Sequence, residues 1–186
     1  MKKMYKAMLL VLCAILLVAG SVMGTLAYLK DKTETVKNTF TVGKVEITLQ
    51  EKAIDPETGK EVTGNAVAGL TNIKLVPGRE IKKNPFITVE AGSENCYLFV
   101  EVVNTISEDY GTINWETGWT KLSGNIWYYN ATNNAGKTVD VFTSFNCKNF
   151  TEYKGVANPS ITITAYAVQA EGFNSASEAW GAANFS

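Results

Sequence analysis

Two cysteines are the residues of this sequence whose chemistry is easiest to specify. Cys96 and Cys147 each lie in a stretch that alternates apolar and polar residues, and strand alternation directs both thiols toward an expected core. A disulfide between them would close a loop of about 50 residues and add about 4 kcal/mol to the free energy of unfolding on the chain-entropy model. The alternative is a pair of buried thiols that pack as small hydrophobic side chains. Their spacing alone leaves both interpretations open.

The 186-residue sequence contains no histidine, which excludes several kinds of catalytic site. Ser-His-Asp and Cys-His nucleophilic sites both need an imidazole base. A zinc helix of the His-Glu-x-x-His type needs two imidazole ligands. No pair of carboxylates stands out as an acid and a base. We therefore expect no catalytic residue, no metal ligand and no cofactor, and we expect that the chain is not an enzyme.

Residues 1–27 have the layout of a cleaved secretory signal peptide. Three lysines within residues 2–6 precede an uncharged apolar run at residues 8–22. Small residues then stand at positions 25 and 27, which predicts cleavage between Ala27 and Tyr28. The alternative is a retained membrane anchor, but a bilayer core needs about 20 apolar residues and this run is shorter. We expect a secreted protein that contacts the membrane only through its uncleaved signal.

The processed chain has the size of one domain. Removal of residues 1–27 would leave 159 residues with 14 basic and 18 acidic side chains, and so a net charge of −4. This length allows a substantial core. Such a mild negative charge gives no electrostatic footprint for nucleic acid or for an anionic membrane, so neither partner is expected. Export would also place the two later cysteines in a compartment where disulfides persist.

The body of the chain has the pattern of an all-β protein. About eight alternating stretches are separated by glycine and proline turns, and they include residues 45–49, 70–76, 95–104, 138–147 and 161–170. This regular spacing predicts a two-sheet sandwich. The Ser175-x-x-Glu178 spacing is that of a capping box, which predicts a short helix through Trp180 that Gly181 can end. We expect one or two short helices in all.

Aromatic residues gather between residues 115 and 129, where three tryptophans and two tyrosines occur. Such a density could form a flat platform that binds carbohydrate. The alternative, which we favour, is that the large rings pack across the strands of the sandwich.

The region around the cleavage site resembles a known family. Residues 24–28, Asp31 and residues 38–43 resemble the start of the TasA/camelysin family of Gram-positive exported proteins, which a signal peptidase of the SipW type processes. Later stretches at residues 75–78, 96–100, 126–129 and 163–170 fit the same resemblance. It covers nearly the whole chain, and the signal with the segment after it is its most specific part.

The resemblance implies a jelly-roll domain at residues 41–186 and a subunit that polymerises into extracellular biofilm-matrix fibres. The physical mechanism would be strand addition, in which an extended arm pairs with an open sheet edge of the next subunit. The expected arm is residues 28–40, and its contact residues would be Tyr28, Leu29, Val36 and Phe40. The expected partners are further copies of the chain in a head-to-tail filament, the SipW-type peptidase and, as candidates, minor matrix subunits. Alternatively, the arm pairs with its own domain.

Two other functions are open at this point. A secreted β-sandwich that binds cell-surface polysaccharide through its aromatic strands would have a similar sequence. A metalloprotease is suggested by descriptions of camelysin relatives, but the absence of histidine argues against the zinc site that it would need.

Overall fold

The computed structural model describes residues 4–6, 8, 11–17 and 43–185. Residues 1–41 and 42–186 form two separate units. The described residues of the first unit are helical. No helix in the described ranges is both long enough and apolar enough to cross a bilayer.

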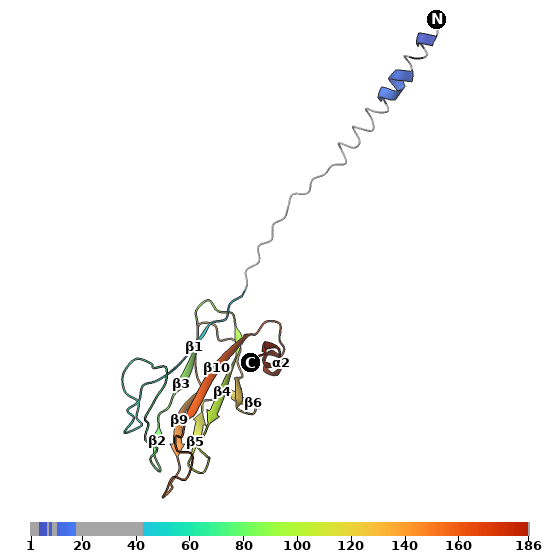
Figure 1. Ribbon diagram of the computed structural model, residues 1–186. Coiled ribbons are helices and arrows are strands. Elements are labelled where there is room, and N and C mark those ends of the chain that lie inside the picture. Colours follow the sequence, from blue (N-terminus) through green and yellow to red (C-terminus); the bar gives the residue numbers. More distant parts are fainter. Residues whose placement is uncertain (1–3, 7, 9–10, 18–42, 186) are drawn as a thin grey trace. The chain divides into compact units, whose positions relative to one another are not determined.

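The second unit consists of ten short strands and one helix. In chain order these are β1 (Ile47–Glu51), β2 (Glu80–Ile81), β3 (Pro85–Val89), β4 (Cys96–Asn104), β5 (Gly111–Trp115), β6 (Trp119–Ser123), β7 (Ile126–Tyr129), β8 (Thr138–Asp140), β9 (Phe142–Cys147), β10 (Ile161–Gln169) and α2 (Ala176–Ala183) (Figure 1).

The strands form two facing layers. One layer is the antiparallel sheet β10-β4-β7-β6, and the other consists of the sheets β1-β3-β8 and β2-β9-β5. These two smaller sheets continue one another, because only Val141 separates β8 from β9 and its amide donates to the carbonyl of Pro85. Strands far apart in sequence, such as β4 and β10 or β2 and β9, are neighbours, as in a jelly roll. The expected all-β, jelly-roll-like sandwich is confirmed.

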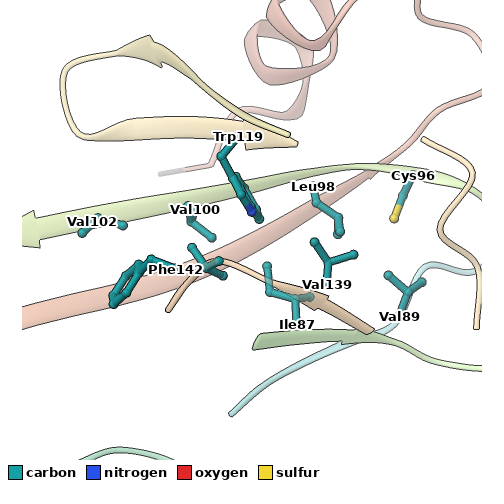
Figure 2. Packing of buried hydrophobic residues seen from close by; sticks show 10 residues of the cluster. Ile87, Val89, Cys96, Leu98, Val100, Val102, Trp119, Val139 and Phe142 are labelled. Carbon is teal, nitrogen blue, oxygen red and sulfur yellow. The ribbon is translucent and has the colours of Figure 1, made fainter. Parts of the chain in front are cut away.

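The core lies between the two layers. Leu98 and Val100 of β4 are fully buried and point toward Ile87 and Val139 of the facing layer (Figure 2). Trp119 enters the same cluster from β6 (Figure 2). Strand alternation explains why every second residue of β4 contributes to this core.

Helix α2 covers the outer face of the sheet that contains β4 and β10 (Figure 1). Phe99 is fully buried beneath it, and its ring centroid lies 5.0 Å from that of Trp180. Ser175 caps the helix, since its hydroxyl accepts a bond from the Glu178 amide, as the sequence predicted. The helix does not end at Gly181, however. It runs to Ala183 and ends at Asn184, which has the left-handed conformation of a C-cap.

The expectation of a strand at residues 70–76 is wrong. This segment is irregular, and Asn72 has a φ of +59° that an extended backbone cannot accommodate. Its apolar residues Leu70, Ile73 and Leu75 instead pack against a second core cluster around Ile81 and Phe145.

A matched pair of substitutions in β4 tests this placement of the core. Val100 is fully buried, whereas Val103 is 39% exposed. We expect Val100→Ala to lower the free energy of unfolding by about 2 kcal/mol, because it removes buried methyl groups and leaves a cavity. Val103→Ala should change it by less than about 0.5 kcal/mol. Equal losses for both variants in urea denaturation would contradict the assigned orientation of β4.

Candidate functional site

The residues predicted to form the cleavage site and the arm lie outside the described residues. These are Ala27, Tyr28, Leu29, Val36 and Phe40. Their roles remain predictions. The surface of the sandwich that could receive such an arm is described, as are both later cysteines.

The structure does not bring Cys96 and Cys147 together, and both are free thiols. Cys96 is the first residue of β4, whereas Cys147 packs with Ile106 and Ile161 near the opposite end of that strand. Nine residues of strand span about 26 Å, while a disulfide needs Cα atoms within about 7 Å. The disulfide hypothesis is therefore corrected, and the alternative of two buried thiols describes the structure.

Both thiols lie in environments that suppress their reactivity. Burial raises the pKa of Cys96 to about 11, and it also raises the pKa of Cys147. Asn134 holds Cys96 in place, since its side-chain oxygen accepts a bond from the Cys96 amide at 3.1 Å and its side-chain nitrogen donates to the Cys96 carbonyl at 2.7 Å. A thiol that stays protonated is a poor nucleophile. These cysteines therefore act as core residues.

The aromatic residues close one side of the sandwich instead of forming a flat platform. Trp115 of β5 stacks on Trp127 of β7, with ring centroids 4.0 Å apart. Trp119 is 8% exposed, and its indole nitrogen donates to the Asp140 carbonyl at 2.9 Å. The interpretation that these rings pack across the strands is confirmed.

The opposite side of the sandwich is bounded by two edge strands, β1 and β10. They lie beside each other but are not hydrogen-bonded, and each has a sheet neighbour on only one side among the described residues. We call this region the β1–β10 corner. It consists of the inward-facing, partly buried side chains of Val45, Ile47, Leu49, Ile161, Ile163, Ala165 and Ala167.

Alternate residues of β10 present free backbone groups at this corner. Thr105 donates to the Ser160 carbonyl, and Ala170 donates to the Asn95 carbonyl, so the even-numbered residues of β10 bond to β4. In an antiparallel ladder, the odd-numbered residues of β10 therefore direct their amides and carbonyls away from β4. Residues 161, 163, 165, 167 and 169 therefore present five amides and five carbonyls at an edge with no strand partner in the described part of the chain.

The free edge of β1 is shorter. Its even-numbered residues bond to β3, as the donation from Glu90 to the Glu46 carbonyl shows. Ile47 and Leu49 therefore direct their backbone groups outward. At Glu51 this edge is already covered, because Glu51 and Val67 exchange both backbone bonds at 2.8 Å.

The core is incompletely covered at the corner. The four inward-facing apolar side chains of β4 are at most 6% exposed, whereas the inward-facing side chains of β10 all remain partly accessible to solvent. The inward-facing apolar residues of β10 change along the strand from the larger Ile161 and Ile163 to the smaller Ala165 and Ala167. Free backbone groups and accessible apolar side chains thus coincide on one strand.

A pocket of about 460 Å³ continues the corner at the Ile161 end of β10. Aliphatic side chains line much of it, from residues 70–75, from Ile81 of β2 and from Ile161. Lys83 also reaches this pocket, but its ammonium group forms an ion pair with Glu51, and both side chains are about nine-tenths buried. The pocket therefore carries no uncompensated charge from Lys83.

Within the described ranges, no three His, Cys, Asp or Glu side chains are grouped so that they could hold a metal ion. Sequence reasoning found the strands of the corner but missed the pocket and the Lys83–Glu51 pair. The pair joins residues 32 positions apart, and no local pattern indicates such a contact.

Thiol titration tests the corrected cysteine assignment. In a Cys13→Ser chain, we expect no reaction with Ellman's reagent at pH 8 while the protein is folded, because burial keeps both remaining thiols protonated and inaccessible. Two thiols should react once guanidinium unfolds the chain without a reductant. Fewer than two would indicate a disulfide.

The buried ion pair gives a second prediction. Glu51→Gln should lower the free energy of unfolding by about 3–5 kcal/mol, because it leaves the Lys83 charge buried without a partner. The neighbouring Glu80–Lys82 pair is the control. Its side chains are each 46% exposed, and Glu80→Gln should cost less than about 1 kcal/mol. Equal costs in denaturant titrations would show that the Lys83–Glu51 pair is solvated.

Comparison of the chain with models of protein families, with curated proteins and with solved structures finds no match. The resemblance found in the sequence therefore stays an expectation. The β1–β10 corner and its pocket are the features from which a function can be proposed.

Proposed function

We propose that this protein is an exported structural subunit that assembles head to tail into extracellular fibres. Each copy would donate residues 28–40 as an extra strand to β10 of the next copy. The observation that carries the proposal is the free edge of β10, where unpaired backbone groups and accessible apolar side chains belong to the same residues. A strand added there would form hydrogen bonds and cover the core in one step.

The proposed contact leads to a filament because the two surfaces differ. The arm of one copy meets the edge of another, so each copy keeps one unused arm or edge for the next. An isologous dimer would instead use the same surface twice. Backbone bonds would supply much of the affinity, and Leu29, Val36 and Phe40 would supply side-chain contacts.

Export and processing would control when assembly begins. A chain still held in the membrane by residues 1–27 has no free arm to offer. Cleavage after Ala27 by a SipW-type peptidase would release the arm outside the cell, where the expected matrix forms. Minor matrix subunits could join the same filament if they offer a comparable arm or edge.

Two variants of the chain that begins at Tyr28 test this proposal. Deletion of residues 28–36 removes most of the arm and leaves the edge intact. Ala165→Pro removes one outward-facing amide of β10 and leaves the ladder to β4 in place, because proline is tolerated where its missing donor would face solvent. Ala157→Pro, in the loop before β10, is the matched control.

We expect the unmodified chain and the control to form filaments under negative stain. Each test variant alone should stay monomeric, because one lacks most of its arm and the other carries a proline ring in the middle of the edge, where an incoming strand would pair. A mixture of the two should form one-to-one dimers and nothing longer, since only one arm and one edge remain functional. Light scattering after size-exclusion chromatography measures both outcomes. Filaments from the arm-deleted variant would exclude the donor-arm mechanism.

A further inference from the structure

Resting on that proposed function, we propose that the pocket at the Ile161 end of β10 receives Phe40 from the arm of a second copy. We further propose that the arm runs antiparallel to β10. The pocket would then be the anchoring subsite that sets the direction and register of assembly.

The direction of the arm along β10 follows from the position of Gly43, the first described residue of the second unit. A Cβ atom placed on Gly43 would lie 3.1 Å from the Gln169 side-chain oxygen, so the described part of the second unit begins at the Gln169 end of β10. The pocket lies at the Ile161 end of the same strand, about 26 Å away. In a head-to-tail stack, an arm that leaves the Gln169 end of one copy enters the next copy at its pocket end. Its N-to-C direction there is opposite to that of β10.

The position of Phe40 in the arm fits this entry point. Phe40 precedes Gly43 by three residues, or about 10 Å of extended chain, so it is the first large apolar side chain to enter the next copy. Thirteen extended residues span about 43 Å, which exceeds the length of β10. The arm is therefore long enough to reach the pocket and to cover the whole edge.

Strand alternation then selects the other contacts. If the arm is extended, Val36 and Phe40 would lie on one face of it, and Leu29 and Thr39 on the other. If Phe40 is level with Ile161, Val36 is level with Ala165, where a small side chain leaves room for it. In an uninterrupted strand, Leu29 would face away from the core, so in this register only Val36 and Phe40 of the three residues proposed to supply side-chain contacts would reach it.

The chemistry of the pocket suits an aromatic side chain. Leu70, Ile73, Ile81 and Ile161 provide aliphatic walls, and Phe145 contributes a ring. Because the Lys83 charge is paired with Glu51, a neutral ring enters without separating an unpaired charge from water. By contrast, an acidic residue at this position of the arm would find no unpaired ammonium group on Lys83 with which to form an ion pair.

Binding of a synthetic peptide, residues 28–42, to a chain that begins at Gly43, and therefore has no Phe40 of its own, tests the anchor. We expect Phe40→Ala in the peptide to weaken binding about thirtyfold or more in isothermal titration calorimetry, as for other central aromatic contacts. Thr39→Ala, the adjacent residue on the opposite face, should change the affinity by less than about threefold. Equal effects of both substitutions would overturn the assignment of Phe40 to the pocket.

Disulfide trapping tests the direction separately. A Phe40→Cys peptide should cross-link to Thr71→Cys at the rim of the pocket, and a Lys32→Cys peptide should cross-link to Gln169→Cys. The buried Cys96 and Cys147 should not compete. The reverse pairing, Phe40→Cys with Gln169→Cys, would overturn the inferred direction while the proposed function stands. If the unmodified peptide does not bind at all, the proposed function fails and this inference fails with it.

Discussion

Because a β-strand alternates, each residue of β10 that turns its side chain toward the core also turns its backbone amide and carbonyl toward the free edge. Its even-numbered residues bond to β4 and turn their side chains outward, where Tyr166 packs beneath Trp180 of α2. Its odd-numbered residues turn their side chains toward the core and their backbone groups toward the free edge. Wherever this edge is unpaired, the core behind it is therefore incompletely covered. One added strand, as proposed here, would pair the edge and cover the core together.

Different kinds of side chain fill the space between the two layers at the two sides of the sandwich. At the β5–β7 side, Trp115 and Trp127 stack across the layers, and the ring of Trp119 fills the space between them and the core. At the β1–β10 corner the inward-facing side chains are aliphatic, and two of those on β10 are alanines. Aromatic rings that close the layers leave little apolar surface for a partner, whereas small side chains leave room for one. This asymmetry would restrict the proposed strand addition to one side of the molecule.

Local sequence patterns predicted most of the strands and the helix of this fold, but they did not predict which strands lie next to each other. The alternation in β4 and β10 and the spacing from Ser175 to Glu178 are properties of short stretches, and the corresponding strands and helix are present. The strand predicted at residues 70–76 is absent, because one residue with a left-handed backbone, Asn72, interrupts an otherwise suitable apolar pattern. The cysteine pairing and the free edge of β10 depend on which strands become neighbours. No window of sequence contains that information, so the disulfide alternative and the location of the open edge could not be decided before the structure.

Strands β10 and β4 form nine residue pairs. This ladder runs along the sandwich from the Gln169 end, near Gly43, to the end that carries the pocket. A pulling force applied between those two ends acts along the strands. A force that loads this ladder would act on its hydrogen bonds in shear, and they would have to break together, so we expect the sandwich to resist pulling best in this direction. The same ladder pulled at right angles would open one bond at a time, as a zipper does.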